Sequence, residues 1–257
     1  MGKGRYTVRE GIVLRRSELP SGDVVVTLLS ETGKWRAVAR KGKLVGGNLG
    51  KLSLFHDVTV QQYGRNGGSD ELALITQVQL NGALPRLSDP AIYPYAHVLA
   101  ELTDKLAVEV QLEGQLYHLF AGALRGLSRH PDPEAVALVM GWRLLAQGGL
   151  APRLARCARC GGPLEGSGEG RFDVAAGGLS CAACASGFRV AAPVVDDLIA
   201  LHRQSVREVL ARPLEPRRAH WTLLLRYLTF HVGELKSLSG LATQGPEPTP
   251  PPQAAAP

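Results

Sequence analysis

The chain shows two kinds of hydrophobic pattern, and the change between them falls near Pro90. From Thr7 to about Leu80, short apolar runs rich in Val, Ile and Thr alternate with turn-forming sequences such as "LPSGD" and "ETGK". This pattern predicts five β-strands. They are expected in "TVREGIVLR", "DVVVTLLS", "GKWRAVAR", "LFHDVTVQQ" and "LALITQVQ". Five short strands in about eighty residues favour a small antiparallel OB-like β-barrel, and the pattern also permits a five-stranded meander.

Beyond Pro90 the apolar residues recur every three or four positions, which predicts helices. About five are expected, over 92–106, 116–127, 133–147, 195–209 and 221–235. The fold class expected is therefore an OB-like barrel domain over 1–80 and an all-helical domain over 81–241, with a cysteine-containing module inserted at 153–190. The Pro- and Ala-rich end, 242–257, has no hydrophobic pattern and is expected to be disordered.

The inserted module contains the four cysteines of the chain, in two pairs of identical spacing: Cys157, Cys160, Cys181 and Cys184. Two Cys-x2-Cys pairs are typical of a structural zinc site. Disulfides would need an oxidising compartment. An iron–sulfur cluster also takes four cysteines, but the paired spacing favours zinc. A deaminase-type zinc site would need a His-x-Glu motif, which the sequence lacks. We therefore predict one structural zinc ion held by four thiolates.

Positive charge is concentrated in the predicted barrel. The net charge is +6, and residues 1–80 hold 12 basic against 7 acidic side chains. The segment from Lys34 to Lys51 has six basic residues and no acid. If 34–40 is a strand, Trp35, Ala37 and Ala39 face the barrel core and the alternate side chains face outward. The candidate DNA-binding residues are Lys34, Arg36, Arg40, Lys41, Lys43 and Lys51, joined by Arg15 and Arg16 at the end of the first strand.

A basic sheet-and-loop surface holds nucleic acid mainly by neutralising phosphates. The alternative is a solvated basic face without a ligand. "GGNLGKL" is not a nucleotide-binding P-loop, because Val45 replaces the first glycine and Leu52 replaces the metal-binding hydroxyl. No apolar run is long enough to span a bilayer, and the start shows no secretory signal, so a cytoplasmic location is expected.

Two segments, "GIVLRRSELPSGDVVVTLLSETGKWRAVARKGK" and "LLRYLTFHVGELKSLSGLA", together with the cysteine pairs, resemble the bacterial RecO family of recombination mediators. The resemblance covers about 1–240. It implies a non-enzymatic DNA repair protein, monomeric alone, in the bacterial cytoplasm and associated with the nucleoid. It implies binding of single- and double-stranded DNA, annealing of complementary strands, and loading of RecA, with RecR, onto strands coated by single-stranded DNA-binding protein.

The resemblance also bears on individual sites. It implies DNA contacts at Lys34, Arg36, Arg40, Lys41 and Lys43, and an apolar groove among the helices for the acidic-hydrophobic tail of single-stranded DNA-binding protein. Two other functions stay open. One is a zinc-stabilised adaptor for protein assembly, in which Arg153, Arg156 and Arg159 would matter more than the barrel. The other, a zinc hydrolase or deaminase, has the least support.

Overall fold

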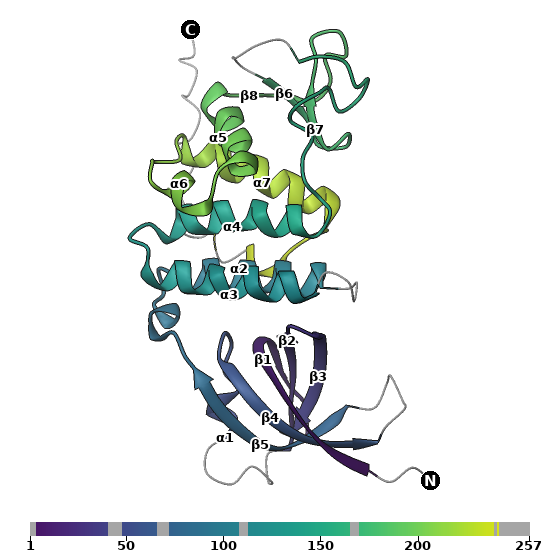
Figure 1. The fold of residues 1–257 in the computed structure, drawn as a ribbon, viewed down its shortest axis with the longest axis vertical. Coiled ribbons are helices and arrows are strands. Elements are labelled where there is room, and N and C mark those ends of the chain that lie inside the picture. The colour runs from purple at the N-terminus through teal and green to yellow at the C-terminus, as the bar shows by residue number, and fades with distance from the viewer. Residues whose placement is uncertain are drawn as a thin grey trace, which may run out of the picture.

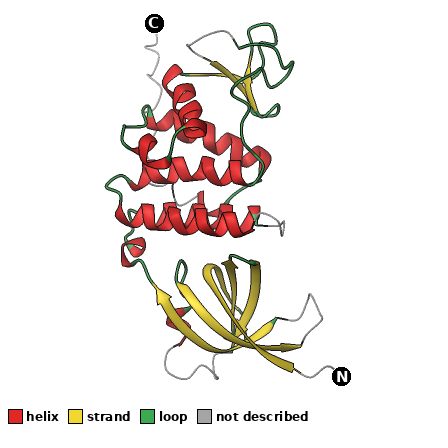
Figure 2. Cartoon of the chain, viewed as in Figure 1, coloured by secondary structure: helices red, strands yellow, loops and turns green. Residues whose placement is uncertain are grey.

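The computed structural model describes residues 4–40, 48–65, 72–107, 113–164, 170–238 and 241. Three parts follow one another along the long axis of the molecule (Figure 1): a β-barrel at one end, helices in the middle, and a small sheet with the cysteines at the other end. Figure 2 shows the same division by secondary structure. The mixed architecture predicted from the sequence is confirmed. Within the described residues, no helix is long and apolar enough to cross a membrane.

Five strands form a closed barrel in the order β1-β2-β3-β5-β4. They are β1 (Gly4–Glu18), β2 (Val24–Ser30), β3 (Gly33–Ala39), β4 (Asp57–Arg65) and β5 (Ala73–Gly82). Neighbours are antiparallel except β3 and β5, which pair in parallel. The five predicted strands are thus confirmed. A four-residue helix, α1 (Asn48–Lys51), was not predicted, because its sequence is rich in glycine and reads as a loop.

The barrel interior is filled by aliphatic side chains and one tryptophan. Trp35, Ala37 and Ala39 are all buried there, and Arg36 between them is exposed, so the predicted alternation along β3 is confirmed. Part of the outer wall is apolar and packs against the helices. Ile12 and Leu29 project from this wall into the helical core. The barrel is therefore attached to the helices through a continuous hydrophobic contact.

The middle of the molecule contains six α-helices and two short 3-10 helices among the described residues. They are α2 (Tyr93–Leu106), α3 (Glu113–Arg129), α4 (Pro133–Gln147), α5 (Ala192–Arg203), α6 (Val206–Leu210), α7 (Arg217–His231), η1 (Pro85–Ser88) and η2 (Lys236–Leu238). The single helix predicted over 195–209 is two helices, because Ser205 starts α6 with a capping box closed by Glu208. The last helix ends at His231, before Gly233 at φ +89°.

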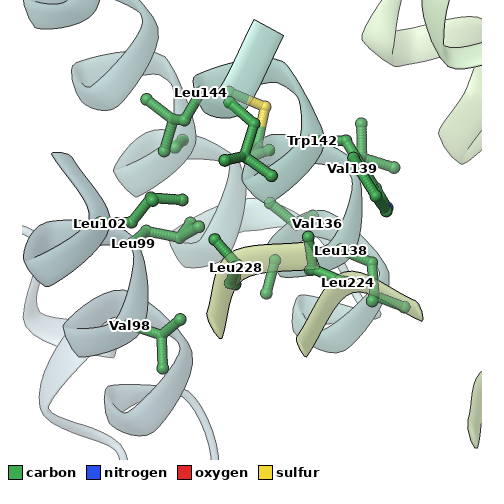
Figure 3. Close-up of a cluster of buried hydrophobic side chains, with 14 of the residues drawn as sticks. Val98, Leu99, Leu102, Val136, Leu138, Val139, Trp142, Leu144, Leu224 and Leu228 are labelled. Carbon is green, nitrogen blue, oxygen red and sulfur yellow. The ribbon is translucent and has the colours of Figure 1, made fainter. Parts of the chain in front are cut away.

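Helix α4 lies at the centre of the helical core, as its apolar sequence predicted. Every residue from Ala135 to Trp142 is buried. Figure 3 shows its side chains together with Leu99 and Leu102 of α2 and with Leu224 and Leu228 of α7. The contact with α7 is close enough that a Cβ on Gly141 would lie 3.1 Å from Leu224. A helix that is apolar nearly all round is thus buried at the centre of the domain.

The cysteine module is built on a three-stranded sheet in the order β7-β6-β8. Its strands are β6 (Gly170–Asp173), β7 (Gly178–Ser180) and β8 (Phe188–Val190). The hairpin predicted between the cysteine pairs corresponds to β6 and β7. Phe172 of β6 is fully buried and lies edge-on to Tyr227 of α7, with ring centroids 5.9 Å apart. This aromatic contact anchors the module to the helices. The predicted disordered tail, 242–257, lies outside the described residues.

Candidate metal centre and nucleic-acid interface

The four cysteine sulfurs converge on one point beside the small sheet. The sulfurs of Cys157, Cys160, Cys181 and Cys184 all lie within 4.8 Å of one another, and those of Cys160 and Cys181 are 3.7 Å apart. A zinc ion with four bonds of about 2.3 Å to sulfur requires sulfur–sulfur distances of roughly 3.8 Å. The arrangement therefore fits a tetrahedral metal ion, and four thiolates would fill its coordination shell.

Two similar turns place the cysteines. The amide of Gly161 donates to the carbonyl of Cys157, and the amide of Ala185 donates to the carbonyl of Cys181, each over 2.9 Å. Both turns need a residue with positive φ, namely Gly161 at +72° and Ala185 at +47°. The small residues after each cysteine pair thus permit left-handed backbone that a bulky side chain would resist.

Backbone amides also prepare one thiol for metal binding. The amides of Cys160 and Cys181 point at the sulfur of Cys157 and lower its pKa to about 6, and the Cys181 amide lies 3.3 Å from it. Cys157 is therefore mostly thiolate at neutral pH, the form that ligates metal. Hydrogen bonds with the sulfurs of Cys160 and Cys181 raise the pKa of Cys184 to about 12. A divalent ion would offset this rise by stabilising the fourth thiolate.

A buried carboxylate joins the two cysteine turns. Asp173 accepts hydrogen bonds of 2.6 Å from Arg159, in the first turn, and 2.6 Å from Ser186, after the second. It also accepts from the amide of Ala176 at 3.0 Å. These donors, Ser186 foremost, hold the pKa of Asp173 at about 2. The Arg159 guanidinium is paired with Asp173 inside the module, so it is less available to bind a partner protein in the adaptor alternative.

The predicted DNA-binding residues divide into two groups, and the first faces the helices. Lys34 of β3 makes an ion pair of 3.0 Å with Asp104 of α2 and donates to its carbonyl over 2.5 Å. Arg15 of β1 lies 3.8 Å from the same carboxylate. The expectation that this basic segment has no counter-charge is therefore wrong at Lys34. Sequence reasoning missed Asp104 because it lies 70 residues further along the chain.

The second group has no carboxylate partner among the described residues. Arg36 and Arg40 are exposed, and neither makes an ion pair with a side chain in the described part of the chain. Strand pairing sets Arg15 and Arg36 on either side of Thr27 and on the same face of the sheet. Basic side chains of β1 and β3 thus flank the uncharged β2 and form a basic strip, in which Asp104 pairs with Arg15 and Lys34.

The remaining candidates occupy separate positions. Arg16 pairs with Glu18 at 3.1 Å, on the opposite face of β1 from Arg15. Lys51 of α1 is half-buried and donates to the carbonyl of Val78 over 3.2 Å. Lys41 and Lys43 lie outside the described residues. The structure therefore brings Arg15, Lys34 and Arg36 onto one face, places Arg40 directly after β3, and leaves Arg16 and Lys51 apart from them.

The sequence of this chain is similar to that of a known protein family. Residues 87–239 match the family model "Recombination protein O C terminal". A DNA repair protein RecO from Anaeromyxobacter sp. (strain K) is 32% identical over 234 residues, covering 87% of this chain and 90% of that protein. The chain belongs to the RecO family. The RecO protein of Bifidobacterium adolescentis is 35% identical over 181 residues, which cover 68% of this chain and 72% of that one.

RecO membership supports a role in DNA repair and recombination, and the family match spans the helices and the cysteine module. A third RecO protein, from Roseiflexus sp. (strain RS-1), is 31% identical and covers 88% of this chain. Among solved structures, an asparaginyl-tRNA synthetase from Pyrococcus horikoshii matches 40% of this chain and 30% of its own, with a TM-score of 0.28 and 13% identity. That likeness is too weak to inform the fold or the function.

Proposed function

We propose that this chain is a DNA repair and recombination mediator whose OB-like barrel, residues 1–80, binds single- and double-stranded DNA and anneals complementary strands. The observation that carries the proposal is the exposed arginine pair, Arg36 and Arg40, beside a strip of further basic side chains on one barrel wall. Arginines without an internal counter-charge repel one another less when phosphates neutralise them, and the counterions released from DNA favour binding.

Annealing follows from the same charge. Two complementary strands repel each other, and a surface that neutralises phosphates on both lets their bases pair. No nucleotide cofactor is required for this step, because the base pairing itself supplies the free energy. With RecR, the chain would then help to load RecA onto strands coated by single-stranded DNA-binding protein, as the family resemblance implies.

We assign the four-cysteine cluster to one structural zinc ion, bound by Cys157, Cys160, Cys181 and Cys184. The support is the thiolate-only donor set and the sulfur spacing, which suit zinc. The ion would hold together a module that has only ten residues in strands and several glycines. Because the shell would be complete, the metal's role in this proposal is to stabilise the module that flanks the helices.

A charge-reversal experiment tests the DNA-binding proposal. Replacing Arg36 and Arg40 by Glu should slow annealing of complementary oligonucleotides at least about tenfold, because two positive charges are lost from the binding surface and two negative charges are added. The control, Arg207→Glu with Arg218→Glu, makes the same change in net charge at exposed helical positions far from the barrel. If the barrel variant anneals as fast as the control variant, Arg36 and Arg40 do not form the binding surface.

A groove beside the first cysteine turn is our candidate receptor for the tail of single-stranded DNA-binding protein. Its volume is about 520 Å³, and its lining includes the apolar residues Leu154 and Ile199 and three arginines, Arg153, Arg156 and Arg203. A lining that combines apolar and cationic side chains suits an acidic-hydrophobic peptide. Reversing Arg153 and Arg203 to Glu should slow annealing only on coated strands. Equal annealing of coated strands by wild type and variant would contradict this assignment.

A further inference from the structure

A continuous row of side chains crosses four strands on the outer wall of the barrel. In the strand pairing, Val38 of β3 lies opposite Leu74 of β5, Leu74 lies opposite Tyr63 of β4, and Tyr63 lies opposite Tyr6 of β1. Residues directly opposite each other project from the same face of a sheet. With strands about 4.8 Å apart, the row follows the curved surface of the closed barrel for roughly 14 Å from β3 to β1.

The row faces solvent, because its neighbours along each strand face the interior. Ala37, Gln62 and Ile75 are buried, and they alternate with Val38, Tyr63 and Leu74. Arg36 lies two residues before Val38 on β3, so these two side chains project from the same face of that strand. Arg40 directly follows β3 and is exposed as well. The row therefore begins on β3, close to these two arginines in the sequence, and continues round the closed barrel to a pair of tyrosines on β4 and β1.

The tyrosine pair is unusually accessible. The rings of Tyr6 and Tyr63 have centroids 5.0 Å apart at an angle of 54°, and the residues are 61% and 41% exposed. Val8, two residues from Tyr6, and Leu72, two residues from Leu74, are exposed as well. Of the eight large hydrophobic residues exposed in the described part of the chain, four therefore gather here. Such a concentration marks an interaction surface rather than isolated exposed side chains.

We propose that Tyr6 and Tyr63 form a stacking platform for the unpaired bases of single-stranded DNA, while Arg36 and Arg40 hold the phosphates of the same strand. This inference rests on the proposed DNA binding by the barrel and adds the part that recognises bases. The occupant follows from the chemistry: exposed cations and flat, exposed rings on the outside of one small barrel suit a ligand that is anionic and aromatic. In a duplex the base faces are covered by stacking, so the platform selects single strands.

The test measures binding of the full chain to an oligodeoxythymidine and to a duplex of equal length. Tyr6→Ala with Tyr63→Ala should lower affinity for the thymidine strand by about tenfold or more and leave duplex affinity unchanged. Tyr6→Phe with Tyr63→Phe should restore single-strand affinity, because stacking needs the ring and not the hydroxyl. The matched control is Tyr93→Ala, a 39% exposed tyrosine on α2 outside the platform.

A second measurement separates stacking from a structural role. An abasic strand keeps the phosphates and lacks the bases. Wild type should therefore bind the abasic strand about as weakly as the double-alanine variant binds the thymidine strand. Tyr63→Trp should report binding directly through quenching of its fluorescence by thymidine bases, beyond that of the native tryptophans. Absence of quenching in a variant that binds the strand would overturn the platform.

The outcomes distinguish failure of the stacking platform from failure of the proposed DNA binding by the barrel. If the double-alanine variant binds the thymidine strand like wild type while Arg36→Gln with Arg40→Gln weakens it, the platform is wrong and DNA binding by the barrel stands. If neither pair of substitutions alters binding, the barrel is not the DNA-binding surface. An equal loss on single strand, duplex and abasic strand would show that the tyrosines only maintain the fold.

Discussion

Gly187, directly after the second cysteine turn, is the residue on which the module's geometry depends most tightly. Its φ is +83°, and a Cβ added there would lie 2.1 Å from the carbonyl oxygen of Phe172. Gly161, after the first cysteine pair, has a similar φ of +72° but open space around its Cα. Substituting each glycine by alanine therefore separates two effects: the free-energy cost of a left-handed backbone, present at both positions, and the cost of a steric clash, present at Gly187 alone.

We expect Gly187→Ala to destabilise the cysteine module severely and Gly161→Ala to cost only about 1 kcal/mol. The strain of positive φ is common to both, and the contact with Phe172 is added at Gly187 alone. The measurement is the zinc content of the purified chain during titration with a chelator. Gly187→Ala should release its metal at lower chelator concentration than Gly161→Ala. Identical release from both variants would contradict the predicted close contact.

Single residues also show where sequence reasoning succeeds and where it stops. Alternation along β3 predicted that Trp35 is buried and Arg36 exposed, because a strand has a period of two whatever surrounds it. The partner of Lys34 could not be predicted, because Asp104 reaches it only once α2 packs on the barrel wall. Likewise, nothing local indicates that Asp173 joins the two cysteine turns.

At the scale of elements, α2 and the barrel are held together by charge as well as by apolar contact. Near the end of α2, Asp104 lies against Lys34 of β3 and Arg15 of β1, and its side chain is only 16% exposed. The carboxylate lies between these two cations and neutralises part of the basic strip. If the strip binds DNA as proposed, Asp104 competes with phosphates for Lys34 and Arg15.

Asp104→Asn should strengthen binding of DNA to the barrel. The change removes one negative charge and frees Lys34 and Arg15, so affinity at low salt should rise roughly 3- to 10-fold. The free energy of unfolding should fall by about 1 kcal/mol, because the partly buried ion pairs are lost. The control is Asp196→Asn, an exposed carboxylate on α5 remote from the barrel. An unchanged DNA affinity in Asp104→Asn would show that Lys34 and Arg15 do not contact DNA.

Elements themselves were predictable where local chemistry decides them. The five strands and the central helix α4 followed from hydrophobic period and turn residues, both of which are local. The division of the predicted 195–209 helix depended on the cap at Ser205, whose partner Glu208 is visible three residues later. The small sheet under the cysteines was only suggested, because its three strands are three or four residues long.

At the scale of the whole molecule, the two candidate sites lie at opposite ends. The barrel carries the basic strip and, round its other strands, the tyrosine row. The cysteine module lies beyond the helices (Figure 1). The four cysteine ligands could be proposed from spacing alone, because two identical pairs imply one site. The DNA-binding set could be proposed only in outline, since its usable members depend on strand register and on α2.

The most direct test of the central claim is the salt dependence of binding to single-stranded DNA. For a single strand, the logarithm of the binding constant falls with the logarithm of salt concentration by about 0.7 for each phosphate contact. Replacing Arg36 and Arg40 by Gln should therefore reduce the slope by about 1.4, whereas Arg207→Gln with Arg218→Gln should leave it unchanged. Equal slopes for wild type and the barrel variant would contradict the account, because the two arginines would then make no contact with phosphate.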